Sequence, residues 1–124
     1  MSRKKVLIIE DEEVCTQLVR LVALKSDVDI LTAVDGEEGI QKALSEKPDL
    51  IFLDIMLPKV NGFEVVKALR GQPSMANVPI VVISARSGND GQKILDTGCQ
   101  QFISKPFKVG QIREAMEKFL GWSR

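Results

Sequence analysis

Histidine is absent from this 124-residue sequence, and cysteine occurs only at Cys15 and Cys99. Without histidine the chain has no Ser-His or Cys-His nucleophile pair, no imidazole general base and no imidazole metal ligand. The two cysteines form no CxxC pair and no disulfide framework, so we expect buried thiols rather than a redox centre. Any chemistry of this chain therefore depends on carboxylates, lysine and hydroxyl groups.

Net charge and long apolar runs are lacking as well. The 17 basic and 17 acidic residues balance, which argues against a surface built to bind nucleic acid or an anionic membrane directly. No apolar run approaches the roughly 18 residues of a membrane span, and the N-terminus does not have the pattern of a secretory signal. We therefore expect a cytoplasmic protein.

Five short apolar runs alternate with stretches of helical periodicity. Unbroken runs of valine, isoleucine and leucine are typical of strands buried on both faces of a parallel sheet. We expect strands at 6–9, 29–34, 50–53, 79–83 and 101–103. We expect helices at 14–22, 35–44, 63–69, near 94–95 and at 109–120. The alternation predicts one α/β domain over residues 1–124, a doubly wound five-stranded parallel sheet with five helices on its two faces.

Polar residues follow four of these strands. Glu10 and Asp11 come after the first run, and Asp54 comes directly after the third. Ser84 follows the fourth run, and Lys105 closely follows the fifth. Because parallel strands end at one edge of the sheet, where ligands bind, we expect these side chains to meet there. Neighbouring strands lie about 4.8 Å apart, so the acids would repel one another unless a cation or a proton neutralised them.

This set of groups predicts phosphoryl chemistry at Asp54. With only oxygen ligands available, the expected cation is a hard one, Mg2+ first and Mn2+ second. The Asp54 carboxylate can attack phosphorus and form an aspartyl phosphate. Mg2+ and Lys105 would neutralise the phosphoryl oxygens, and the Ser84 hydroxyl would donate a hydrogen bond to them.

Two other classes of protein use parts of the same pattern. A phosphatase of the haloacid dehalogenase type places a second aspartate two residues after its nucleophile as general acid, but Met56 occupies that position here. We therefore expect the phosphoryl group to be stored rather than turned over. A flavodoxin-type electron carrier would need a phosphate loop rich in Ser, Thr and Gly after the first strand. This chain has Asp11, Glu12 and Glu13 there, whose charge would repel the flavin phosphate.

Four motifs together resemble the response-regulator receiver domain of two-component signal transduction, to which chemotaxis regulators belong. They are VLIIEDEE, LIFLDIMLPKVNGFEVVKALR, IVVISA and FISKPF. The resemblance extends over essentially the whole chain. It implies a flavodoxin-like fold with strand order 2-1-3-4-5. It also implies a signalling switch rather than a conventional enzyme, one that assists its own phosphorylation and slow dephosphorylation.

The resemblance implies a metal site and a phosphate site. Glu10, Asp11, Asp54 and the backbone carbonyl of Met56 would bind Mg2+ or Mn2+. Asp54 would accept the phosphoryl group, and Lys105 would bind its oxygens.

It also implies how the signal is passed on and ended. Ser84 would be the switch hydroxyl and Phe102 the switch aromatic, and the Lys105–Pro106 peptide bond would be cis. Met56 and Arg86 would flank the path of attacking water. Neither side chain orients water well, so we expect a phosphoryl lifetime of minutes or longer.

The partners implied are proteins of a signalling chain. A histidine kinase, a histidine phosphotransfer protein or a small phosphodonor would supply the phosphoryl group. The face formed by the fourth helix, fifth strand and fifth helix would control a downstream effector. We expect no direct contact with nucleic acid or membrane, and a monomer, with dimerisation on phosphorylation left open.

The chain ends soon after the last expected helix, which suits either a single-domain regulator or the receiver part of a longer protein. A receiver that works without phosphorylation would lack an acid, the phosphoacceptor or the lysine, and this chain has all of them.

Overall fold

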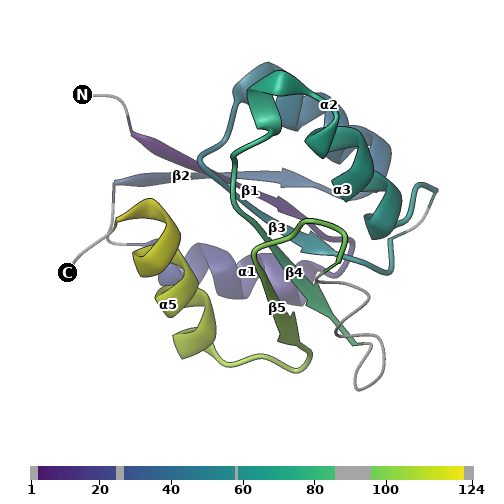
Figure 1. The fold of residues 1–124 in the computed structure, drawn as a ribbon. Coiled ribbons are helices and arrows are strands. Elements are labelled where there is room, and N and C mark those ends of the chain that lie inside the picture. Colours follow the sequence, from purple (N-terminus) through teal and green to yellow (C-terminus); the bar gives the residue numbers. More distant parts are fainter. Residues whose placement is uncertain (1–2, 25–26, 58, 86–95, 122–124) are drawn as a thin grey trace.

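The computed structural model describes residues 3–24, 27–57, 59–85 and 96–121, and Figure 1 shows how its strands and helices alternate along the chain. The strands are β1 (Lys4–Ile9), β2 (Val28–Ala33), β3 (Leu50–Asp54), β4 (Ile80–Ser84) and β5 (Gln101–Ser104). The helices are α1 (Glu13–Val22), α2 (Gly36–Glu46), α3 (Gly62–Arg70) and α5 (Val109–Leu120), with a short 3-10 helix η1 (Pro73–Met75).

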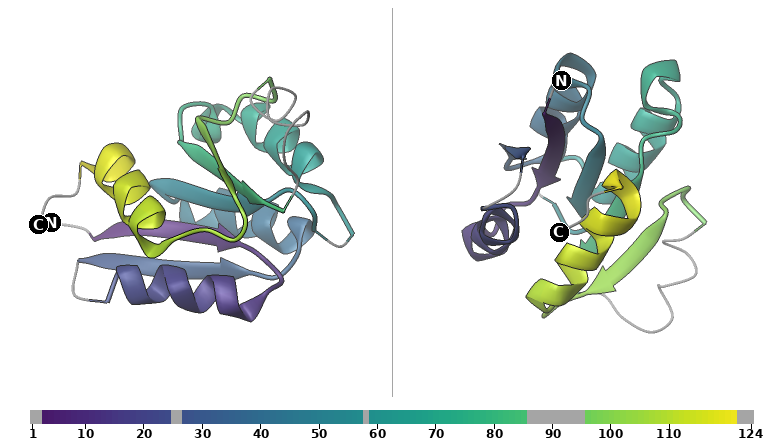
Figure 2. Two further views of the ribbon diagram at one scale, coloured as in Figure 1. Left: turned by 90° about the horizontal axis from the view of Figure 1, so that it is seen from below. Right: turned by 90° about the vertical axis from the view of Figure 1, so that its left-hand side faces the viewer.

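All five strands run parallel in one sheet, in the order β2-β1-β3-β4-β5. This confirms the predicted fold class and strand order. Helices α2 and α3 cover one face of the sheet, and α1 and α5 cover the other (Figure 2). The described residues contain four α-helices rather than the five expected, because the expected helix near 94–95 lies outside them. No helix in the described part of the chain has the length and apolar character needed to cross a membrane.

Two apolar clusters hold the three layers together. Successive side chains of a strand point to opposite faces, so Ile51 and Leu53 pack under α2 and α3, whereas Leu50 and Phe52 pack under α1 and α5. Every residue of β3 and of β4 is buried. Unbroken apolar runs predict this two-sided burial. The carboxyl ends of these strands are therefore fixed by packing on both faces.

Side-chain caps fix the loops that leave β2 and β3. Asp35 accepts a hydrogen bond from the Glu38 amide at 2.8 Å, and the Glu38 carboxylate accepts one from the Val34 amide at 2.7 Å. The Asn61 side chain accepts a hydrogen bond from the Glu64 amide at 3.1 Å. The contacts of Asp35 and Asn61 satisfy first-turn amides that lack a helical partner, and the contact of Glu38 satisfies the amide that precedes the N-cap of α2. Both loops therefore end at defined points beside the carboxyl edge of the sheet.

Arg70 joins the opposite ends of β4 and β5 to the end of α3. Its guanidinium donates to the carbonyl oxygens of Met75 at 2.8 Å and Gly98 at 3.1 Å, and to the Gln100 side-chain oxygen at 2.7 Å. The same Gln100 oxygen accepts a hydrogen bond from the Ile80 amide at 2.7 Å. One planar cation thus fixes where both strands begin.

Gly62 sets how closely α3 approaches the end of β3. Its amide donates to the Ile55 carbonyl at 2.9 Å. A Cβ atom at position 62 would stand 2.4 Å from Ile55 Cα and 2.9 Å from the Asp54 carbonyl oxygen. These neighbours are backbone atoms, which cannot turn aside as the end of a flexible side chain can. Only glycine fits at this position.

We predict that Gly62→Ala destabilises the protein by roughly 1–3 kcal/mol, because the added methyl group overpacks a rigid contact. Gly110→Ala is the matched control, since a Cβ atom there meets nothing within 4 Å. In helix α5 alanine should be more stable than glycine by about 0.5–1 kcal/mol. Urea unfolding of both variants measures the two effects. Equal changes in the free energy of unfolding would contradict the packing role of Gly62.

Candidate functional site

Strand β1 leads directly into a buried carboxylate. Glu10 follows the strand, its amide donates to the Ala33 carbonyl of β2 at 2.9 Å, and it is only 4% exposed. Asp11 and Glu12, the next two residues, are exposed. The Glu12 amide donates to Glu10 Oε2 at 3.1 Å. The turn that connects β1 to α1 therefore orients the Glu10 carboxylate.

Asp54 is the last residue of β3 and is 5% exposed. Its Oδ1 atom accepts a hydrogen bond from the Met56 amide at 2.9 Å. Because β1 and β3 are neighbours, Asp54 lies beside the acids that follow β1. One carboxylate oxygen from each of Glu10, Asp11 and Asp54 lies within 4.8 Å of the others. The structure thus brings together the three acids that the sequence placed at the ends of two strands.

Lys105 brings a cation into this group of acids. Its amide donates to the Ser84 carbonyl at 2.8 Å, which places the residue just beyond β5. Its Nζ atom lies 2.9 Å from Glu10 Oε1, 3.1 Å from Asp54 Oδ2 and 2.5 Å from Glu12 Oε1. The Lys105–Pro106 peptide bond is cis.

The electrostatics of the site follow from burial. Burial raises the pKa of Glu10 to about 7, because the carboxylate loses hydration, although hydrogen bonds from Lys105 and the Glu12 amide oppose the shift. Burial also opposes the charge on Lys105, but its contacts with Glu12, Glu10 and Asp54 outweigh that effect and raise its pKa above the ordinary lysine value. The ammonium group therefore stays charged and compensates carboxylates that would be costly to bury alone.

The carboxylate oxygens of the site are better ligands for a hard divalent cation than the nearby Cys15 thiol is. Cys15 Sγ lies within 4.8 Å of oxygens from Glu10 and Glu12. Burial raises the pKa of this thiol to about 11, and the Glu10 charge adds to the shift. A thiol that keeps its proton is a poor metal ligand. The carboxylates of Glu10, Asp11 and Asp54 are consistent with divalent metal binding, whereas the Met56 carbonyl as a fourth ligand stays a prediction.

Ser84 and Phe102 lie on neighbouring strands. Ser84 ends β4 and is buried. Phe102 lies on β5 opposite Val82 and packs, half-buried, against the apolar cluster under α2 and α3. Since alternate residues of a strand share a face, Ser84 and Phe102 lie on the same face of the sheet. Arg86, predicted to flank the path of water, lies outside the described residues.

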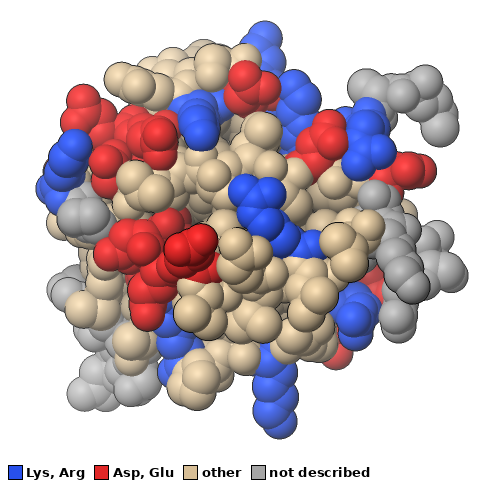
Figure 3. Space-filling view, turned by 180° about the vertical axis from the view of Figure 1, so that it is seen from behind, with Lys and Arg blue, Asp and Glu red and all other residues tan. Residues whose placement is uncertain are grey.

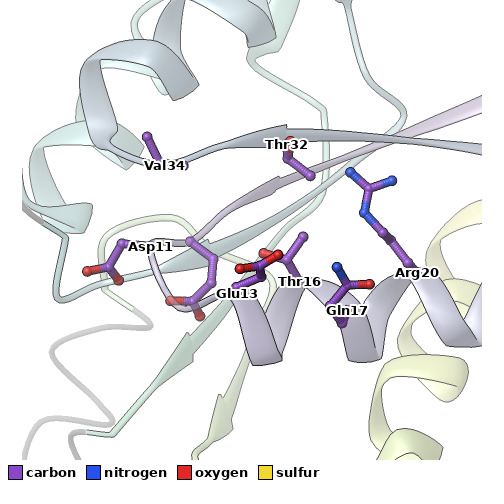
Figure 4. Close-up of a pocket in the computed structure, with 8 residues that line it drawn as sticks. Asp11, Glu13, Thr16, Gln17, Arg20, Thr32 and Val34 are labelled. Carbon is purple, nitrogen blue, oxygen red and sulfur yellow. The ribbon is translucent and has the colours of Figure 1, made fainter.

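A polar groove of about 300 Å³ runs from the acids between α1 and β2, and Figure 4 shows the side chains that line it. Thr16, Gln17 and Arg20 of α1 line this groove, and no role was predicted for them from the sequence. Their spacing of three or four residues could have shown that they share one face of the helix. The groove therefore opens toward Glu10 and Asp11 on the α1 side. It is lined by Glu10, Asp11, Glu13, Thr16, Gln17, Arg20, Thr32 and Val34.

The raised pKa of Glu10 predicts a pH dependence of stability. Because the pKa of Glu10 is higher in the folded state, protonation of Glu10 stabilises the folded protein. This contribution to the free energy of unfolding is present in full below about pH 4.5 and is lost as the pH rises through about 7. In the absence of divalent ions, the free energy of unfolding should fall between about pH 5 and about pH 8. Glu10→Gln, which is always neutral, should flatten that slope. Urea unfolding across this range tests the prediction, and an equally steep slope in the variant would contradict it.

Comparison with known proteins gives relatives over nearly the whole chain. The alkaline phosphatase synthesis transcriptional regulatory protein PhoP of Bacillus subtilis is 39% identical over 118 residues, which are 94% of this chain. The chain spans only 48% of the length of that relative. The polar-differentiation response regulator DivK of Brucella anthropi is 34% identical over 119 residues, which are 95% of this chain and 97% of DivK.

Solved structures share the fold as well. The phosphorylated cyanobacterial phytochrome response regulator RcpA superimposes with a TM-score of 0.85 at 26% identity, covering 98% of this chain and 97% of RcpA. The family model of the response regulator receiver domain matches residues 6–117. With the fold, the acids at the strand ends and these relatives in agreement, the chain belongs to the response regulator receiver domain family of two-component signalling.

Proposed function

We propose that this chain is a phosphorylation-dependent signalling switch that accepts a phosphoryl group on Asp54. The donor is a histidine kinase, a histidine phosphotransfer protein or a small phosphodonor. One observation carries the proposal. Asp54 Oδ2 lies 3.1 Å from the Lys105 ammonium, at the edge of the sheet where Glu10 and Asp11 also present oxygens.

In the proposed reaction an oxygen of Asp54 attacks the phosphorus of the donor. A bond forms between that oxygen and phosphorus while the bond from phosphorus to the donor breaks, and its electron pair stays with the leaving atom. Lys105 holds positive charge where the phosphoryl oxygens arrive, and the Met56 amide already orients Asp54 Oδ1 at 2.9 Å. Mg2+, or Mn2+ in its place, would be held by Glu10, Asp11, Asp54 and the Met56 carbonyl and would neutralise the phosphoryl oxygens.

The proposed product is a stored state. Asp54 has methionine two residues later, so this position offers no general acid or base to assist hydrolysis. The phosphoryl group carries up to about two negative charges, and since the carboxylate gives up its own charge in the acyl bond, the end of β3 becomes more negative by about one charge. Ser84 would move toward its oxygens, and Phe102 would occupy the space that becomes free. Their position on one face of β4 and β5 supports this path to an effector.

We place the protein phosphodonor on the exposed side of α1. Val14 and Leu21 are 72% and 58% exposed and, with Leu18 between them, form an apolar stripe at spacings of four and three residues. That spacing suits packing against another helix. A groove of about 400 Å³ continues the stripe past Val14 and Leu18 to Lys105 and Pro106. In the view of Figure 3, uncharged surface adjoins a group of acidic side chains near one edge.

Continuity with Lys105 favours a helical phosphodonor protein as the occupant of this stripe. A donor helix seated there can present a phosphohistidine to Asp54. Small phosphodonors need no such contact, because they diffuse to the site without a docking surface.

Beryllofluoride binding tests the phosphoacceptor itself. This phosphoryl analogue should bind saturably in the presence of Mg2+, as followed by amide NMR shifts, and Asp54→Ala should abolish binding because the acceptor oxygen is gone. Asp49→Ala is a control at a distant carboxylate, one that accepts a hydrogen bond from the Lys5 amide at 2.8 Å at the other end of the sheet. Absence of binding in folded wild-type protein would refute the proposed function.

A charge on α1 tests the docking surface. Val14→Asp should slow phosphotransfer from a kinase or phosphotransfer protein about tenfold, as expected when an apolar contact at the centre of an interface is lost. Phosphorylation by acetyl phosphate should be unchanged. Ala76→Asp is the control, since Ala76 is also exposed but lies at the opposite edge of the sheet, where its carbonyl accepts a hydrogen bond from Arg70, and does not line the groove that reaches Lys105. Equal slowing with both donors would argue against docking on α1.

A further inference from the structure

Lys105 has an ion-pair partner outside the set of residues assigned to metal and phosphate. Glu12 Oε1 lies 2.5 Å from Lys105 Nζ, alongside Glu10 at 2.9 Å and Asp54 at 3.1 Å. An ammonium group has three hydrogens to donate. Three carboxylates therefore use the full donor capacity of Lys105 before any phosphoryl group arrives.

The Glu12 side chain is free to leave this contact, because the turn does not depend on it. The Glu12 amide donates to Glu10 Oε2 at 3.1 Å, and its carbonyl accepts hydrogen bonds from the Cys15 amide at 3.1 Å and the Thr16 amide at 3.3 Å. These backbone contacts connect β1 to α1. Among the described residues, the only hydrogen-bond or ion-pair partner of the Glu12 carboxylate is Lys105.

Burial decides which of the three contacts yields. The side chains of Glu10 and Asp54 are 2% and 6% exposed, so either carboxylate would lose its partner in a place that water scarcely reaches. The Glu12 side chain is 61% exposed and regains hydration when it turns away. A phosphoryl group on Asp54 therefore obtains a hydrogen bond from Lys105 most easily at the expense of Glu12.

We propose that Glu12 is a positioning residue that competes with the phosphoryl group for Lys105 and thereby weakens binding of phosphoryl groups and their analogues at Asp54. This inference rests on the proposed function, since it assumes that Asp54 is the acceptor. In the unphosphorylated protein Glu12 holds Lys105 toward α1. When Asp54 is phosphorylated, Lys105 turns to the phosphoryl oxygens and the Glu12 carboxylate returns to solvent.

The test compares Glu12→Gln with Glu13→Gln. Both changes remove one negative charge from the same turn, but of the two residues only Glu12 contacts Lys105. In the presence of Mg2+, Glu12→Gln should bind beryllofluoride about two- to fivefold more tightly than wild type, the range expected for loss of an ion pair with a largely exposed carboxylate. Glu13→Gln should change the affinity by less than about 1.5-fold, since its effect acts only through solvent.

A second measurement follows the NMR signals of Lys105, first without ligand and then with beryllofluoride. The NMR signals of the Lys105 ε-methylene group should shift in Glu12→Gln and stay in place in Glu13→Gln. The shift on adding beryllofluoride should be smaller in Glu12→Gln than in wild type, because Lys105 has already left Glu12. If the ion pair between Glu12 and Lys105 only stabilised the fold, Glu12→Gln would lower the urea midpoint of unfolding and leave the affinity for beryllofluoride unchanged.

Each outcome supports or overturns one of the two ideas. Tighter binding in Glu12→Gln alone supports competition for Lys105. Equal affinities in the two variants, or weaker binding in Glu12→Gln, overturn it while wild-type binding leaves the proposed function intact. If folded wild-type protein binds no beryllofluoride, the proposed function is overturned and the role of Glu12 with it.

Discussion

At the carboxyl edge of the sheet, one ammonium group balances carboxylates that folding has taken out of water. Glu10 follows β1 and Asp54 ends the neighbouring strand β3, and the repulsion between their carboxylates would oppose folding without a cation between them. Lys105 supplies that cation from the far side of β4. The same fixed charges are consistent with divalent metal binding and support the proposed transfer of a phosphoryl group to Asp54.

The rest of the fold keeps this balance in place. Burial on both faces holds the ends of β3 and β4, and Gly62 lets α3 approach the loop after Asp54. At the opposite edge, Arg70 fixes where β4 and β5 begin. The strands are thus restrained at their starts by hydrogen bonds to one guanidinium and at their ends by the charges of the site. A change in charge at Asp54 therefore acts at the carboxyl ends of β4 and β5, while Arg70 restrains the opposite ends of these two strands.

Much of this arrangement could be predicted from the sequence, because it depends on repeated local patterns. Apolar runs of Val, Ile and Leu predict buried parallel strands, and the residues that follow such strands must meet at one edge. The convergence of Asp54 and Lys105 with the acids after β1 follows from this rule. The sequence could not show which two of the four consecutive acids after β1 contact the lysine. That choice depends on where β1 ends and α1 begins, and the turn directs Glu10 inward and Glu12 across to Lys105. The role of Arg70 was equally hidden, because Gly98 and Gln100 lie about thirty residues away in sequence.

Cys15 gives the site a built-in reporter. Its thiol is held in the protonated form by burial and by the nearby Glu10 charge, and it lines the groove that leads to Lys105. Any ion or ligand that neutralises Glu10 weakens the second of these effects, so the rate at which Cys15 reacts with an alkylating reagent follows the charge of the site. Cys99, buried in the apolar cluster on the other face of the sheet, serves as an internal reference. The alkylation rate of Cys15 in the unlabelled protein therefore reports whether an ion or ligand occupies the site.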